Sequence, residues 1–148
     1  MPICQSDILL ITQNVFETMV NMGVCIGELP QQQSQERITG CVQISGAWRG
    51  AVMLQTTEKL VRHAASEMLS IKGHEVTAAD MEDTLAEITN MIGGNIKSQV
   101  PSPSYLSLPS VTTGQDFNFR LNGAEVVSEV PMNSHNQPLN VVICEAKE

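Results

Sequence analysis

Residues 77–99 read TAADMEDTLAEITNMIGGNIKSQ, and apolar side chains recur in this stretch with helical spacing. At about 100° per residue, the side chains that share one face are Met81, Leu85, Ile88, Ile92 and Ile96. Thr77 and Asp80 resemble a capping box, with Asp in place of the usual Glu or Gln, and Pro101 and Pro103 follow the far end. The stretch therefore predicts a long helix from about Ala78 to Gln99 that packs one apolar face on a core.

The opposite face of this predicted helix is polar. Within an arc of about 60° it carries Asp83, Glu87, Asn90 and Gly94. Such residues are common on solvated surfaces, so the spacing alone also fits an ordinary exposed helix face. A glycine inside a helix costs roughly 1 kcal/mol relative to alanine. Close approach by another backbone is the usual compensation for that cost.

Two elements are predicted before this helix on the N-terminal side. Residues 5–22 have apolar residues at helical spacing, and Gly23 follows as a stop signal. Residues 38–44 and 50–54 alternate between apolar and polar around the turn residues 45–46. Since the two strands are joined so closely, the sequence predicts an antiparallel hairpin.

A second helix and several strands complete the prediction. Thr56 or Thr57 is a suitable N-cap for a helix that Gly73 ends. After Pro103 apolar residues alternate, and Pro131 with the polar residues 133–138 separates the last two strands. The alternating residues are Tyr105, Phe117, Phe119, Leu121, Val126, Val130, Leu139, Val141 and Ile143. This order predicts an α+β fold, an antiparallel or mixed β-sheet packed against about three α-helices, in a single domain of residues 1–148.

Composition excludes several classes of function. The formal net charge is -8 and the pI is near 4.7, without a cluster of Lys and Arg, so nucleic-acid binding is not expected. The longest apolar stretch, residues 8–26, contains Gln13, Asn14, Glu17 and Asn21, so we expect no membrane insertion. The start of the chain shows no signal peptide, and the four cysteines lack a CxxC pair. We therefore expect a cytoplasmic protein with reduced thiols.

Two motifs resemble a known family. Residues 83–95, DTLAEITNMIGGN, resemble the signature helix of the CheC/CheX/FliY phosphatases, which dephosphorylate the response regulator CheY. The form E-x-x-N-M-I-x-G-N at residues 87–95 is most similar to the CheX branch. Residues 108–114, LPSVTTG, resemble the P-x-V-x-x-G segment that follows this helix in CheX-like domains. The element order also agrees from residue 5 to about residue 145, which implies a CheC/CheX-like fold.

The resemblance implies that the chain is a phosphatase acting on the aspartyl phosphate of a CheY-type receiver. Asn90 matches the family's Asn, which enters the receiver site and orients the attacking water, and Glu87 matches the Glu that pairs with the receiver's lysine. Asp83, Met91 and Gly94 are then expected to contact the phosphorylated receiver. For Asp83, helix-start electrostatics is at least as good an interpretation. Asn95 lies off the polar face and is interpreted as structural.

The resemblance also implies the cofactor and the assembly. The reaction needs Mg²⁺, which the partner receiver holds, so we expect no cofactor bound by this chain. His63, His74 and His135 lack the spacing of a zinc site or a catalytic triad. CheX-like proteins are homodimers joined through sheet edges, so a homodimer is expected here.

Two alternatives to the enzyme stay open. A non-catalytic domain of the same fold would bind a receiver or a signalling assembly without hydrolysis, and a structural role at the flagellar switch is a weaker third possibility. In the first helix, Asp7, Ile11 and Asn14 repeat the spacing of the polar face. Because Ile11 stands where the acid would be, we interpret this helix as core. The polar connection at residues 31–33 is assigned no role.

Overall fold

The computed structural model describes residues 3–29, 36–114 and 123–147. The described residues form three α-helices, one short 3-10 helix and seven strands. In chain order these are α1 (Gln5–Val20), β1 (Cys25–Ile26), β2 (Arg37–Gly46), β3 (Gly50–Thr57), α2 (Glu58–Leu69), η1 (Gly73–Glu75), α3 (Ala78–Lys97), β4 (Ser104–Leu106), β5 (Ser110–Gly114), β6 (Ala124–Ser134) and β7 (Gln137–Ala146). The expected connection at 31–33 and the expected strand residues Phe117, Phe119 and Leu121 lie outside the described residues.

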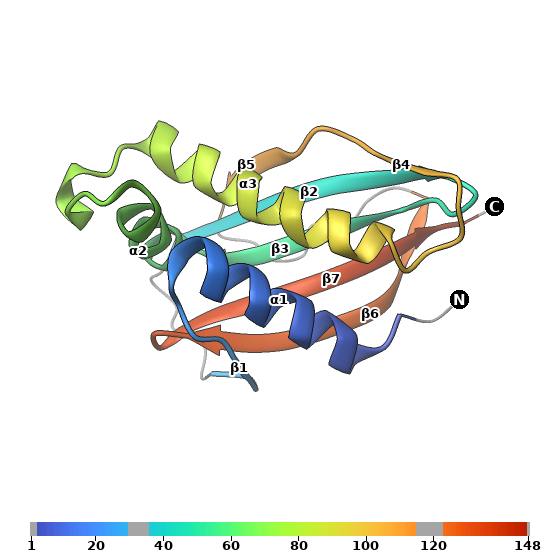
Figure 1. Cartoon of the computed structure of the whole chain (residues 1–148), viewed down its shortest axis with the longest axis horizontal. Helices are drawn as coiled ribbons and strands as arrows, with labels where there is room; N and C mark the ends of the chain where they lie inside the picture. The colour runs from blue at the N-terminus through green and yellow to red at the C-terminus, as the bar shows by residue number, and fades with distance from the viewer. Residues whose placement is uncertain (1–2, 30–35, 115–122, 148) are drawn as a thin grey trace.

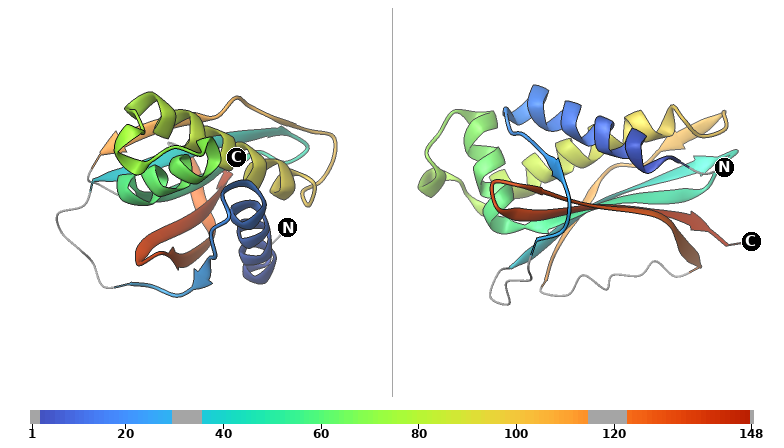
Figure 2. Two further views of the ribbon diagram at one scale, coloured as in Figure 1. Left: turned by 60° about the vertical axis from the view of Figure 1, so that its left-hand side comes forward. Right: turned by 90° about the horizontal axis from the view of Figure 1, so that it is seen from below.

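The strands form one antiparallel sheet, in the order β1-β6-β7-β3-β2-β4, with β5 also paired to β2. All three helices lie on the same face of this sheet, as the edge-on view in Figure 2 shows. In Figure 1, α1 and α3 run side by side across the sheet and α2 lies at one end. The α+β class with an antiparallel sheet is therefore confirmed.

The main core lies between the helices and the sheet and consists mostly of aliphatic side chains and methionines. The five residues predicted to anchor α3 on this core are all buried. They are Met81, Leu85, Ile88, Ile92 and Ile96. From α1, Ile8, Val15 and Phe16 enter the same core, while Ile11 packs at its margin. The helical periodicity in the sequence thus identified the correct buried faces.

Side chains start the helices at the predicted positions. The Thr57 side chain accepts a hydrogen bond from the Leu60 amide (3.2 Å) at the start of α2. At α3 the capping box is complete, because Asp80 N donates to Thr77 Oγ1 (3.1 Å) and Thr77 N donates to Asp80 Oδ2 (3.0 Å). Each cap satisfies amides that have no partner within the helix and stabilises it by about 1 kcal/mol.

The predicted helix ends at Gly23 and Gly73 are wrong. The helices end earlier, at Asn21 and Ser70, which both adopt left-handed backbone conformations (φ 53° and 55°). Glycine is preferred at such a position because it has no Cβ, but Asn and occasionally other residues adopt it. The nearest glycine was therefore a misleading stop signal in both cases.

The predicted break at Pro131 is also wrong, because β6 continues through it to Ser134 and turns at His135 and Asn136. The Pro131 carbonyl accepts a hydrogen bond from Gly27 N (3.0 Å), so it points away from β7. In an antiparallel strand a residue's N–H and C=O point to the same side. The ring of Pro131 therefore replaces an outward N–H and leaves the pairing with β7 intact.

Candidate functional site

Two glycines allow α3 to pack closely against the sheet. A Cβ on Gly40 of β2 would collide with the Thr89 side chain, and a Cβ on Gly93 of α3 would collide with Val42. A Cβ added at Gly93 would also lie 3.5 Å from Leu106 Cδ1 of β4. The loss of helix propensity at Gly93 is thus compensated by contact with the strand beneath it.

The opposite side of α3 faces outward and carries the predicted site residues. We call Asp83, Glu87, Asn90 and Gly94 the α3 row. Asp83 and Glu87 are exposed, and Asn90 and Gly94 are half-buried. Nothing lies within 4 Å of a Cβ built on Gly94, so the surface beside Asn90 is open. Residues three apart on a helix are neighbours, so Glu87 and Asn90 project side by side.

The two polar side chains at the centre of the row have no partners among the described residues. Neither Glu87 nor Asn90 makes a side-chain hydrogen bond or ion pair there. The neighbouring Asn95 differs, because its Nδ2 donates to the Met91 carbonyl one turn back (2.8 Å). A carboxylate and an amide with free hydrogen-bonding capacity, held on a packed helix, can enter a cavity in another molecule.

The other two predicted contact residues, Met91 and Asp83, are both exposed on α3. Met91 is 42% exposed and lies beside Asn90 on the surface of α3. Asp83 is the sixth residue of the helix, and the acidic residue of the first turn is Asp80. Because the favourable effect of the helix dipole is confined to the first turn, Asp83 gains little from it. This position argues against the helix-start interpretation of Asp83.

The related spacing in α1 does not reproduce the α3 row. Asp7 and Ile11 are half-buried and Asn14 is exposed. Ile11 packs against the main core, as its place in the apolar pattern predicted. Asn14 therefore stands without an acidic neighbour at the position that corresponds to Glu87.

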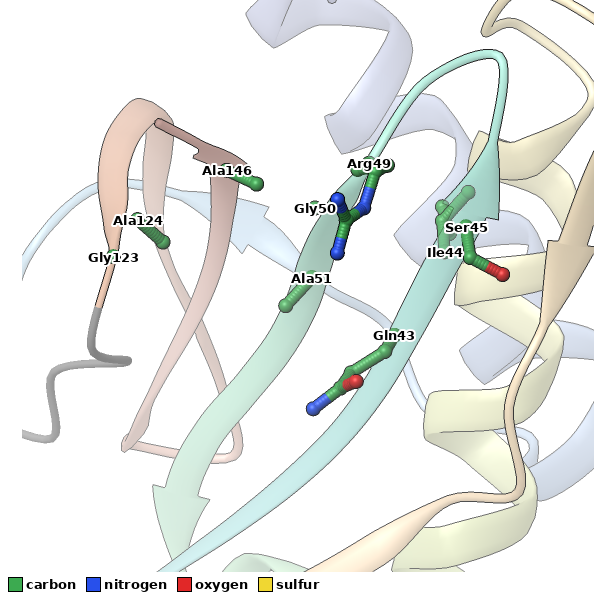
Figure 3. Close-up of a pocket in the computed structure, with 9 residues that line it drawn as sticks. All are labelled: Gln43, Ile44, Ser45, Arg49, Gly50, Ala51, Gly123, Ala124 and Ala146. Atoms are coloured by element: carbon green, nitrogen blue, oxygen red, sulfur yellow. The ribbon is translucent and has the colours of Figure 1, made fainter. Parts of the chain in front are cut away.

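A cleft of about 210 Å³ lies on the other face of the sheet (Figure 3). Gln43 and Arg49 stand over it, and small residues such as Ala51 and Ala124 form its floor. Ala51 belongs to a small apolar cluster that is separate from the main core. The cleft is smaller than typical ligand pockets of about 300–1,000 Å³. We therefore take the projecting α3 row, and not the cleft, as the candidate site.

The described residues contain no group of three or more His, Cys, Asp or Glu side chains that could hold a metal ion. They do contain one histidine pair that the sequence gave no reason to expect. The rings of His63 and His135 lie 4.4 Å apart between centroids, where α2 meets the turn between β6 and β7. These residues are 72 positions apart, so only the fold brings them together.

The family follows from comparison with known proteins. The family model described as "Chemotaxis phosphatase CheX" matches residues 38–133, which is more than half of the chain. The chain belongs to the CheX family. The matched range includes all of α3 and the segment at residues 108–114 that resembled this family. A comparison with curated proteins found no match.

Solved CheX-related structures share the fold. A putative chemotaxis protein from Desulfovibrio vulgaris Hildenborough is 20% identical, with a TM-score of 0.74 over 95% of this chain and 94% of that chain. CheX from Vibrio vulnificus gives the same identity, TM-score and coverage. A CheX-CheY-BeF3-Mg²⁺ complex from Borrelia burgdorferi matches at 16% identity, with a TM-score of 0.68 and 99% of both chains covered. At these identities the similarity shows the fold alone.

None of the described helices is long and apolar enough to cross a membrane.

Proposed function

We propose that this CheX-family protein hydrolyses the aspartyl phosphate of a CheY-type receiver domain. The observation that carries the proposal is the pair Glu87 and Asn90, side by side on α3, outward-facing and without partners among the described residues. Membership of the CheX family and the fold shared with a CheX that was solved in complex with CheY support it. In this proposal α3 docks on the receiver and both side chains enter the phosphorylation site.

Asn90 acts on the attacking water. An amide both donates and accepts hydrogen bonds, so its oxygen can accept from a water while its NH₂ donates to a phosphoryl oxygen. Phosphoryl transfer requires the attacking and leaving oxygens to be roughly in line, and catalysis consists mainly of positioning and charge stabilisation. Asn90 is suited to this task because it is held on a helix whose buried face is fixed on the sheet.

Glu87 fixes the docked orientation by pairing with a lysine of the receiver. A carboxylate is a charge-assisted acceptor, and an ion pair that becomes desolvated at an interface gives both affinity and register. Asp83 and Met91 contact the receiver around this pair, and Gly94 leaves room for its backbone. In this proposal the receiver holds the Mg²⁺ that the reaction needs.

The test is the lifetime of the phosphate on a Mg²⁺-loaded receiver phosphorylated by a small-molecule donor. We expect the wild type to shorten this lifetime and Asn90→Ala to lose roughly 100-fold or more of the activity while still binding. Asn95→Ala is the matched control. It also removes an asparagine side chain from α3, but from a position outside the α3 row. If the wild type binds a receiver and leaves the lifetime unchanged, the chain is a non-catalytic adaptor.

We also propose that the protein forms a homodimer through a sheet edge. Among the described strands, one edge is β6, which β1 pairs only at residues 132 and 133, and the other edge is β4 with β5; unpaired edge strands favour association. Sedimentation at micromolar concentration should give twice the chain mass of 16.1 kDa. A species of one chain mass would contradict this.

A further inference from the structure

The α3 row is too small to form a protein interface by itself. From Asp83 to Gly94 it extends about 16 Å along a helix about 10 Å wide, or on the order of 160 Å². A specific interface buries roughly 800 Å² on each partner, and weak transient ones several hundred. A receiver that docks on the row must therefore also cover the elements beside α3.

One of these elements is the connection between β4 and β5. Leu106 of β4 packs beneath α3 at Gly93, and β5 also contacts α3. Figures 1 and 2 show the connection running alongside α3 at the edge of the sheet. In this connection Leu108 is 91% exposed, which makes it the most exposed large apolar side chain of the described residues.

Leu108 stands on a fixed backbone. Ser107 N donates to the Gln43 carbonyl (2.9 Å), and Gln43 N donates to Ser107 Oγ (2.9 Å). Pro109 follows directly and restricts the chain further. An exposed leucine on a constrained loop loses little backbone entropy on binding, so more of the energy of its apolar contact is retained as affinity.

We propose that Leu108 is a docking residue for the receiver. This inference rests on the proposed function, and it adds an apolar contact beside the polar α3 row. An interface with an apolar contact next to a charged pair has the usual composition of a specific protein contact. A second copy of this chain is the alternative occupant, and sedimentation of the variants distinguishes it from the receiver.

The experiment compares Leu108→Asp with Val126→Asp. Val126 is a 57% exposed apolar residue of β6, paired with Cys144 of the small cluster on the other face of the sheet. Against a phosphorylated receiver, Leu108→Asp should raise KM roughly tenfold or more and leave kcat unchanged. Val126→Asp should have the KM of the wild type, and so should Leu108→Met, because methionine keeps an apolar side chain at this position. Unfolding curves should agree for all three variants, since both positions are exposed.

Two results would overturn the inference. One is an equal KM for Leu108→Asp and Val126→Asp. The other is a change in sedimentation of Leu108→Asp with KM unaltered, which would assign Leu108 to a contact between copies of the chain. If the wild type is inactive, the proposed function fails, and the readout becomes the Kd for a receiver loaded with Mg²⁺ and beryllofluoride. A weaker Kd for Leu108→Asp than for Val126→Asp then supports the docking role, whereas equal values or no binding overturn it.

Discussion

Thr89 of α3 sits directly on Gly40 of β2, where any side chain on residue 40 would collide with it. Thr89 is fully buried, and its hydroxyl donates to the Leu85 carbonyl within the helix (2.7 Å). The next residue along α3 is Asn90. The distance between helix and strand at this contact therefore sets the height at which the amide projects from the surface.

Gly40→Ala should destabilise the fold by roughly 1–3 kcal/mol, because the added methyl group overpacks the contact between α3 and β2. Urea unfolding measures this difference directly. Gly114→Ala is the matched control, since Gly114 is also a strand glycine but has nothing within 4 Å of an added Cβ. Equal stability of the two variants would mean that α3 can move away from β2 at no cost.

Gly94→Ala should separate stability from docking. Because the space around residue 94 is open, alanine should stabilise the helix by about 0.5–1 kcal/mol. The same methyl group should raise KM for the receiver if the receiver's backbone approaches there. Gly93→Ala, one residue earlier, should instead lower stability by collision with Val42. A Gly94→Ala variant with wild-type KM would exclude close approach at this position.

Glu87→Gln should weaken receiver binding roughly tenfold, because it removes the charge that pairs with the receiver's lysine and keeps the shape of the side chain. The effect should shrink as salt is added, since ions screen a surface charge pair. Glu145→Gln removes the same charge from strand β7 instead of the α3 row and serves as the control. If both variants lost the same amount of receiver affinity, Glu87 would contribute only through the net charge of the protein.

Thiol alkylation should discriminate between exposed and buried cysteines. Burial, reinforced by the nearby Cys144 thiol, raises the pKa of Cys41 to about 11, whereas a hydrogen bond with Ser6 lowers the pKa of the exposed Cys4. Since the thiolate is the reacting form, Cys41 should react slowly at pH 8 and about tenfold faster per pH unit up to pH 11. Mass mapping after a short pulse of iodoacetamide should find Cys4 modified first. Early modification of Cys41 would contradict the burial of this strand.

The helices could be predicted from the sequence because their signals are local. The starts at Thr57 and Thr77 depend on a side chain and an amide three residues later, and the buried face of α3 depends on spacing within one helix. Helix ends were less predictable, because Asn21 and Ser70 adopt a conformation for which glycine is only the commonest choice. The path of β6 through Pro131 depended on which side of the strand its missing N–H faces, a property set by the neighbouring strands.

Within the candidate site, the features that lie on one helix could be predicted from the sequence, and the contacts between distant segments could not. That Glu87, Asn90 and Gly94 share a face follows from helix geometry, and their exposure agrees with it. The sequence did not indicate that Gly40 and Gly93 hold α3 against β2, because their contacts with Thr89 and Val42 join residues 49 and 51 positions apart. For the same reason it did not indicate that residues 107–109 run beside α3. The roles of Glu87 and Asn90 themselves stay predictions.

Strand β2 serves both faces of the sheet. Its even-numbered residues Gly40 and Val42 meet α3, and the odd-numbered Gln43 and Ser45 line the cleft on the far side. The α3 row faces away from the sheet, so the row and the cleft lie on opposite sides of the two layers formed by α3 and β2. A small molecule resting in the cleft and a protein bound over the helices would not exclude one another, so both could be accommodated at once.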